Sequence, residues 1–212
     1  MDPEFWHARW KAGQIGFHEG RVNPMLASHL PRLQLAPAAR VFLPLCGKTR
    51  DIAWLAEQGL RPVGAELSGI AIAQLFDEMG CEAVREPAGR LMRHHAGAVE
   101  VFEGDIFDLD AETLGPVAAV FDRAALVALP AQMRARYGRH VTALCRRAPQ
   151  LLVSFVYDQS VMAGPPFSVE GDEIAAIYGD AYAVELIDDR EVPGGLKGFC
   201  PARAQTWAMT PR

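Results

Sequence analysis

Short apolar runs alternate with longer segments of helical periodicity along most of the chain after residue 40. Such alternation is typical of parallel strands that are joined by crossover helices. The expected strands are 41–43, 62–66, 99–102, 117–121 and 151–156, and the expected helices are 49–58, 68–80, 130–147 and 169–178. We therefore expect an α/β fold in which helices cover both faces of a mostly parallel sheet.

The two ends of the chain depart from this alternation. Asp2-Pro3 and Asn23-Pro24 each predict the start of a helix, because an Asx side chain can accept free backbone N–H groups and proline suits the first turn. Residues 1–35 are therefore expected to form a helical prefix. Near the other end, apolar runs at 183–187 and 205–209 indicate two closing strands, one of which can be antiparallel at a sheet edge.

Residues 82–97 form the least regular segment, because a proline and two glycines interrupt it. A hairpin around 91–94 is the structure we expect there. The adjacent His94 and His95 could suggest a metal site, but no second cluster at ligand spacing accompanies them. We expect this pair to lie in a solvated loop and expect no bound metal.

The composition narrows the possible environments and partners. With 212 residues, half of them hydrophobic, the chain is expected to form a single domain over 1–212. A net charge of -5 without a Lys/Arg cluster argues against nucleic acid as a partner, and no apolar run approaches the roughly 20 residues of a membrane span. Four scattered cysteines, with no CxxC pair and no secretory leader, favour a reduced cytoplasm. We expect a cytoplasmic monomer.

The turn after the first strand, 44–48, is the strongest local signal of function. In open parallel sheets a ligand binds beyond the carboxyl ends of the strands, usually beside this turn. Glu66 follows Gly47 by 19 positions and ends the second strand, where a nucleoside binder places an acid on the ribose hydroxyls. A lone glycine turn or strand-end acid is usually structural, but together they indicate a nucleoside-type ligand.

The glycine pattern of this turn limits which nucleoside it can bind. A dinucleotide site requires G-x-G-x-x-G, and this turn has one glycine. Gly47-Lys48-Thr49 with Asp122 also resembles parts of a P-loop nucleotide hydrolase, which is an alternative reading. That motif requires a glycine where this chain has Phe42, inside the strand. S-adenosylmethionine carries no phosphate, so a one-glycine turn and an acid would suffice for it.

Several motifs resemble thiopurine S-methyltransferases, particularly bacterial ones, in sequence and in order. They are Trp6-x-x-x-Trp10, Phe17-His18, Phe42-x-Pro44-Leu45-Cys46-Gly47-Lys48, Phe121-Asp122-Arg123-x-Ala125-Leu126-Val127-Ala128, Tyr157-Asp158 and Gly164-Pro165-Pro166-Phe167. The resemblance implies a Rossmann-like class I methyltransferase with a seven-stranded type of sheet, one antiparallel edge strand and an N-terminal helical lid. It implies transfer of a methyl group from S-adenosylmethionine to the sulfur of a thiopurine or a similar small aromatic thiol.

The same resemblance assigns candidate site residues. The implied cofactor contacts are Trp10, Leu45, Gly47, Glu66, Asp105, Ile106 and Arg123, with Phe17 and Phe167 on the substrate side and Arg123 as the catalytic residue. Residue chemistry alone leaves other readings open: Trp10 could belong to the core, Asp105 could cap a turn, and Arg123 could pair with Asp122. Cys46 lacks an evident base, and we interpret it as packing.

Methyl transfer to a thiolate is an in-line displacement that needs no enzyme nucleophile. Alignment of donor and acceptor can contribute on the order of 7–11 kcal/mol, and Arg123 could stabilise the thiolate or orient a water that removes the proton. The family has a further arginine late in the chain, and the segment Arg190 to Phe199 shows no match to it. The acceptor therefore stays open among thiopurines, selenium compounds and tellurium compounds. A non-catalytic S-adenosylmethionine sensor is the second alternative, against which Phe17 and Arg123 argue.

Overall fold

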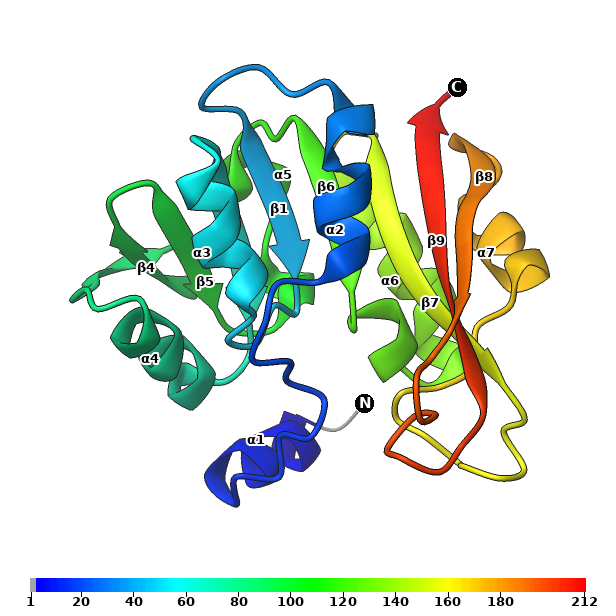
Figure 1. Cartoon of the computed structure of the whole chain (residues 1–212). Helices are drawn as coiled ribbons and strands as arrows, with labels where there is room; N and C mark the ends of the chain where they lie inside the picture. The colour runs from blue at the N-terminus through cyan, green and yellow to red at the C-terminus, as the bar shows by residue number, and fades with distance from the viewer. Residues whose placement is uncertain (1–2) are drawn as a thin grey trace.

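The computed structural model describes residues 3–212, and the nine strands within that range form one sheet (Figure 1). Along the sheet the strands follow the order β3-β4-β5-β2-β1-β6-β7-β9-β8. They are β1 (Arg40–Pro44), β2 (Arg61–Glu66), β3 (Val84–Ala88), β4 (Leu91–Ala96), β5 (Val99–Glu103), β6 (Ala119–Arg123), β7 (Gln150–Tyr157), β8 (Tyr182–Glu191) and β9 (Ala202–Pro211). Strands β5, β2, β1, β6 and β7 are parallel to one another, as the alternating pattern predicts.

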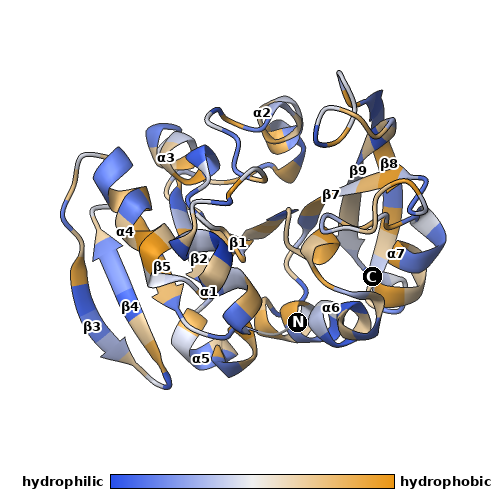
Figure 2. Ribbon diagram, turned by 90° about the horizontal axis from the view of Figure 1, so that it is seen from below, coloured by the Kyte–Doolittle hydropathy of each residue, from blue (hydrophilic) through white to orange (hydrophobic). Residues whose placement is uncertain are grey.

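Helices cover both faces of this sheet, which confirms the expected layers. The helices are α1 (Pro3–Lys11), α2 (Pro24–His29), α3 (Arg50–Glu57), α4 (Gly69–Glu78), α5 (Ala111–Leu114), α6 (Ala131–Leu144) and α7 (Gly171–Tyr178), with short 3-10 turns at Leu30–Leu33, Ile106–Asp108 and Leu126–Ala128. Helices α2, α3 and α4 lie on one face, and α5, α6 and α7 lie on the other (Figures 1 and 2).

Strand β1 shows how the pleat divides the core between these two layers. Phe42 is fully buried on the face of α6 and α7, whereas Val41 and Leu43 pack on the face of α3 and α4. Successive side chains of a strand point to opposite faces, so a central strand buried on both sides reads as a continuous apolar run. The burial of Phe42 inside β1 also excludes the loop glycine that a phosphate-binding motif requires there.

The sheet departs from the expected seven-stranded type in two respects. The hairpin β3–β4, expected near 91–94, is present, and β4 pairs antiparallel with β5 from Met92↔Glu103 to Ala96↔Val99. This hairpin extends the sheet past β5, so the sheet has nine strands. The antiparallel strand β9 is not at the edge as expected, because β8 pairs with its far side and becomes the edge strand.

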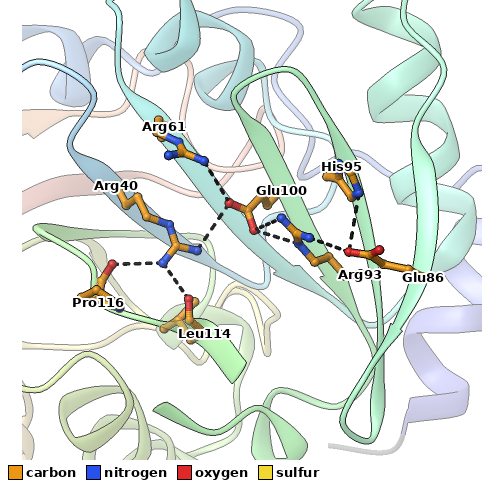
Figure 3. A network of polar contacts seen from close by, with 8 residues as sticks. All are labelled: Arg40, Arg61, Glu86, Arg93, His95, Glu100, Leu114 and Pro116. Atoms are coloured by element: carbon orange, nitrogen blue, oxygen red, sulfur yellow. Dashed lines mark hydrogen bonds and ion pairs between the residues drawn. The ribbon is translucent and has the colours of Figure 1, made fainter. Parts of the chain in front are cut away.

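An ion-pair network joins the hairpin to the amino-terminal ends of the parallel strands (Figure 3). The largely buried Glu100 lies between Arg93 of β4, at 2.9 Å, and the more distant Arg40 and Arg61, at 3.6 and 3.8 Å. The expectation of a solvated loop for His94 and His95 is wrong. Both lie in β4 and pair with carboxylates, since a hairpin places alternate side chains beside those of its neighbours.

The two helices expected in the N-terminal prefix are present as α1 and α2. Asp2, expected to cap the first helix, lies outside the described residues. Asn23 caps α2 by accepting a hydrogen bond from the N–H of Met25 at 2.9 Å. The backbone N–H of Asn23 donates to the carboxylate of Asp51 at 2.7 Å, which ties this prefix to the start of α3.

Candidate active site

A cavity of about 530 Å³ lies at the carboxyl ends of the parallel strands, within the size range of small-molecule sites. Its walls come from the ends of β1, β2, β5 and β6, from α1 and the segment after it, and from two loops at the far end of the sheet. Figure 2 looks onto this edge, with α1 in front of the strand ends. The predicted residues that line the cavity are Trp10, Phe17, Leu45, Gly47, Glu66, Asp105, Ile106 and Arg123.

The turn after β1 has an unusual backbone conformation and supports an aromatic side chain. Leu45 (φ 47°) and Gly47 (φ 55°) both have left-handed backbones, which a bulky residue such as leucine rarely adopts. Such conformations cluster at functional sites, where the surrounding structure enforces them. A Cβ on Gly47 would lie 3.3 Å from the Cζ2 atom of Trp10, so the glycine lets the indole approach the turn closely.

Glu66 connects this turn to the end of β2. One carboxylate oxygen accepts from the N–H of Gly47 and the other from the N–H of Ser68, both at 2.8 Å. Burial raises the pKa of the Glu66 carboxyl, and these two backbone donors oppose part of that rise. Each oxygen keeps a second lone pair. Glu66 can therefore accept further hydrogen bonds from hydroxyl groups in the cavity.

Arg123 lies at the end of β6, and it does not pair with Asp122, the partner that one reading of the sequence suggested. The local pair with Asp122 does not form, because the Asp122 carboxylate accepts from the hydroxyl of Tyr137 at 2.6 Å inside the core. Instead, Nη1 of Arg123 donates to the carbonyl oxygen of Phe17 at 3.2 Å, and Nη2 pairs with the carboxylate of Glu19. Arg123 therefore contacts the segment that follows α1.

Three aromatic rings pack over the apolar part of this segment. Phe17 meets Trp6 and Trp10 edge-to-face, with ring centroids 5.5 and 5.6 Å apart. Trp10 is 4 % exposed, so the interpretation of this residue as core and its assignment to the cavity are both compatible with its position. Such edge-to-face pairs contribute about 0.5–1.5 kcal/mol beyond their area burial. They stabilise the packing of the apolar side of the cavity.

Asp105 and Ile106 follow β5 and line the same cavity. The carboxylate of Asp105 accepts from the N–H of Phe107 at 2.9 Å and so caps the short turn Ile106–Asp108, as one reading of the sequence suggested. Asp105 is exposed and Ile106 is buried, so together they offer a carboxylate beside an apolar surface. Such a surface suits an uncharged heterocycle with hydrogen-bonding edges.

Phe167 is the one predicted site residue that is not among those lining the cavity. Its ring lies against Gly164 and near the guanidinium of Arg134, and its backbone N–H donates to Val127. Pro165 and Pro166 of the same loop line the cavity instead. The assignment of Phe167 to the substrate side stays a prediction.

Sequence reasoning missed several residues of the cavity wall. They include Glu19, Asp51, Leu196 and Lys197, and also His18, whose motif was recognised without a site role. Leu196 and Lys197 belong to the loop between β8 and β9, in the segment for which no role could be assigned. Burial, and then the nearby Lys48, lowers the pKa of His18. Besides His18, only Glu19 among these residues could have been found from the sequence, because it directly follows the recognised Phe17-His18 motif.

Cys46 packs against the backbone of β2, where a Cβ on Gly64 would lie 2.6 Å from its Sγ atom. Burial raises the pKa of the Cys46 thiol well above its ordinary value, which keeps it protonated and unreactive. Within residues 3–212, His, Cys, Asp and Glu form no group of three or more suited to a metal ion. In the same range, no helix is both long and apolar enough to cross a membrane.

Solved structures define the class of this fold. The chain matches a Burkholderia thailandensis 1,6-didemethyltoxoflavin-N1-methyltransferase, solved with S-adenosylhomocysteine, with a TM-score of 0.67 over 98 % of this chain and 87 % of that one, at 18 % identity. A magnesium protoporphyrin IX methyltransferase from Synechocystis matches with a TM-score of 0.64 over 99 % and 100 % of the two chains, at 13 % identity. The fold is that of class I S-adenosylmethionine-dependent methyltransferases.

Sequence comparison then places the chain within that class. The family model for thiopurine S-methyltransferase matches residues 1–198. A thiopurine S-methyltransferase of Xanthobacter autotrophicus is 57 % identical over 99 % of both chains, and one of Gluconobacter oxydans is 44 % identical over 98 % of this chain and 94 % of its own. The chain belongs to the thiopurine S-methyltransferase family, a family of methyltransferases that use S-adenosylmethionine.

Proposed function

We propose that this chain transfers the methyl group of S-adenosylmethionine to the sulfur of a thiopurine or a similar small aromatic thiol. One observation carries the proposal: the Gly47 turn, Glu66 and Arg123 converge on a single cavity at the carboxyl ends of β1, β2 and β6. The family's name supplies the sulfur acceptor. We further propose that the chain acts as a cytoplasmic monomer made of one domain.

The residues on the β2 and β5 side of the cavity suit the nucleoside part of the cofactor. Glu66 has lone pairs free for ribose hydroxyls, and the exposed carboxylate of Asp105 beside the buried Ile106 suits the edge and face of an adenine. Leu45, Gly47 and Trp10 would hold the methionine part beside the turn. S-adenosylmethionine, when bound, supplies an electrophilic methyl group on a sulfonium.

The residues on the opposite side suit a flat apolar acceptor. Phe17, Pro165 and Leu196 offer apolar surface, and we retain Phe167 as a candidate that would need to move toward the cavity. Lys197 and Arg123 place positive charge there. An acceptor that enters as a thiolate would find a hydrogen-bond donor in Arg123, which can stabilise the anion or orient a water that takes the proton.

These residues act by orientation and by exclusion of water. A sulfonium and a thiolate neutralise each other as the methyl group moves, so the protein need supply no nucleophile. Alignment of the two reacting atoms can lower the barrier by about 7–11 kcal/mol. The cover formed by Trp6, Trp10 and Phe17 would keep water from the reacting sulfur.

The test is transfer of a radiolabelled methyl group from S-adenosylmethionine to 6-mercaptopurine, with selenite and tellurite as parallel acceptors. We expect transfer to 6-mercaptopurine, and transfer only to an inorganic chalcogen would replace the thiopurine as substrate class. Absence of transfer to all three, with retained binding of S-adenosylhomocysteine, would favour a non-catalytic sensor. Calorimetry with ATP–Mg²⁺ addresses the hydrolase alternative, for which the buried Phe42 predicts no binding.

A further inference from the structure

Arg123 binds residues 17–19, the segment after α1, at the wall of the cavity. It donates to the carbonyl oxygen of Phe17 and pairs with the carboxylate of Glu19, and all three residues line the cavity. Glu19 and Arg123 are 104 positions apart in the sequence, so the contact depends entirely on the fold. One guanidinium at the end of β6 thus holds the N-terminal cover in place.

The two members of this ion pair are unequally exposed. The side chain of Arg123 is 13 % exposed, whereas that of Glu19 is 40 % exposed. A carboxylate that is already partly hydrated has less solvation to recover, and less to lose, on moving into water than a fully buried one. Arg123 is the fixed partner, and Glu19 is the one that can leave.

The guanidinium of Arg123 also has an unused donor. Its Nε atom is buried and has no hydrogen-bond partner among the described residues. A buried donor without an acceptor costs about 1–3 kcal/mol and is rare in native proteins. A guanidinium has five N–H donors in a planar fork that suits an anionic acceptor. Within residues 3–212, Arg123 therefore keeps one N–H donor unsatisfied beside the two groups that it already binds.

We propose that Glu19 is a positioning residue that occupies Arg123 until an anionic acceptor displaces it, so that the site favours acceptors that enter as anions. This inference rests on the methyl-transfer function proposed above. Thiolate and carboxylate compete for the same N–H groups, and no covalent bond changes in the exchange. Asp51 also lines the cavity; burial raises the pKa of its carboxyl, whereas Arg123 lowers it and Glu19 raises it, so departure of Glu19 favours the charged form of Asp51 beside Arg123.

Displacement of Glu19 also shifts the segment next to the aromatic cover, while the bond from Arg123 to the Phe17 carbonyl keeps the cover over the cavity. Phe17 is two residues away and packs edge-to-face against Trp6 and Trp10, so movement of residues 17–19 changes the surroundings of both indoles. Acceptor binding and movement of this segment are then one event. Intrinsic tryptophan fluorescence is expected to respond to an anionic acceptor and to respond less to a neutral one.

The test compares Glu19→Gln with the unaltered protein in calorimetry, with S-adenosylhomocysteine present. Glutamine keeps a carbonyl that can accept from Arg123 but removes the negative charge. One ligand is 6-mercaptopurine at a pH at which its thiol is ionised, and the matched neutral ligand is 6-methylthiopurine. Glu19→Asp retains the charge, and Asp189→Asn removes a carboxylate that pairs with Arg203 outside the cavity lining.

We expect Glu19→Gln to bind 6-mercaptopurine on the order of tenfold more tightly, as loss of a competing charge at a charged hydrogen bond predicts. The KM for 6-mercaptopurine should fall by a similar factor, with kcat changed far less. Binding of 6-methylthiopurine should stay unchanged. Glu19→Asp retains the competing charge and should therefore gain less affinity for 6-mercaptopurine than Glu19→Gln, and Asp189→Asn should behave like the unaltered protein.

Unchanged or weaker binding of 6-mercaptopurine by Glu19→Gln would overturn the proposal, as would equal changes for both ligands or no binding by either protein. If Glu19 had only a structural role, Glu19→Gln would weaken binding of both ligands and would lower the unfolding temperature. Methyl transfer to 6-mercaptopurine without tighter binding by Glu19→Gln would contradict this inference but not the proposed function. Tighter binding by Glu19→Gln without any methyl transfer by the unaltered protein would contradict the proposed function instead.

Discussion

The indole of Trp10 lies over Gly47, close enough that a single Cβ on that glycine would come 3.3 Å from it. This contact joins the first helix of the chain to the turn after the first strand. It depends on a glycine with a left-handed backbone, since no other residue adopts φ 55° without strain and leaves the space open. The side of the cavity assigned to the cofactor therefore has a defined position for its aromatic cover.

Gly47→Ala should weaken binding of S-adenosylhomocysteine by about tenfold or more, because the new methyl group pushes Trp10 away from the turn. The left-handed backbone should also cost about 1–2 kcal/mol of unfolding free energy. Gly80→Ala is the matched control, with φ +67° and open space around its Cβ position. Equal affinity of the two variants for S-adenosylhomocysteine, measured by calorimetry, would contradict the proposed role of the contact.

Glu66→Gln should lower affinity for S-adenosylhomocysteine by about ten- to a hundredfold, as expected for loss of hydrogen bonds to a charged acceptor. An amide has one acceptor oxygen, so it cannot accept from the N–H groups of Gly47 and Ser68 with separate oxygens. Urea unfolding is the control for a change in stability. It is needed because burial already disfavours the charged form of Glu66, so the substitution can itself alter the free energy of unfolding. Undiminished affinity would argue against ribose binding by this carboxylate.

Asp122→Asn should change the dependence of stability on pH. Burial raises the pKa of Asp122 to about 6 from an ordinary value of 3.8, despite hydrogen bonds from Tyr137 and Leu126. The folded state thus binds the proton more tightly, so the stabilisation that Asp122 provides is complete below pH 3.8 and is lost as the pH rises through about 6.

Asparagine does not titrate in this range. Between acid and mildly alkaline pH, the unfolding free energy of Asp122→Asn relative to the unaltered protein should therefore rise by up to roughly 3 kcal/mol. Urea titrations across that range measure the difference. A constant difference would mean that the buried carboxyl does not titrate as its surroundings indicate.

Arg123→Ala should lower turnover with 6-mercaptopurine by about ten- to a hundredfold while sparing much of the affinity for S-adenosylhomocysteine. Arg123→Lys keeps the charge without the planar fork and should recover only part of the rate. Initial rates and calorimetry separate the two effects. If turnover is unchanged in Arg123→Ala, this residue has no role at the acceptor.

Strand-end reasoning found the Leu45–Gly47 turn and Glu66, because a parallel sheet brings the carboxyl ends of its strands to one edge. The family resemblance supplied Asp105 and Arg123, which line the same cavity. Local sequence reasoning also predicted the hairpin near 91–94. It did not predict that this hairpin would extend the sheet to nine strands, because pairing of β4 with β5 depends on which edge is open.

Contacts between distant segments lay beyond that reasoning. Arg123 pairs with Glu19 instead of its neighbour Asp122, which turns inward to Tyr137 because successive side chains of β6 face opposite sides. Lys197 reaches the cavity from a loop whose sequence gave no motif. His94 and His95 were expected in a solvated loop, but β4 places them beside carboxylates of neighbouring strands.

The most direct test of the central claim identifies which atom of 6-mercaptopurine receives the methyl group. The purified protein, S-adenosylmethionine and 6-mercaptopurine are incubated, and the product is compared with authentic 6-methylthiopurine and the ring N-methylated isomers by chromatography and mass spectrometry. We expect 6-methylthiopurine, with S-adenosylhomocysteine formed in equal amount. A ring N-methylated product, or S-adenosylhomocysteine without methylated purine, would contradict it.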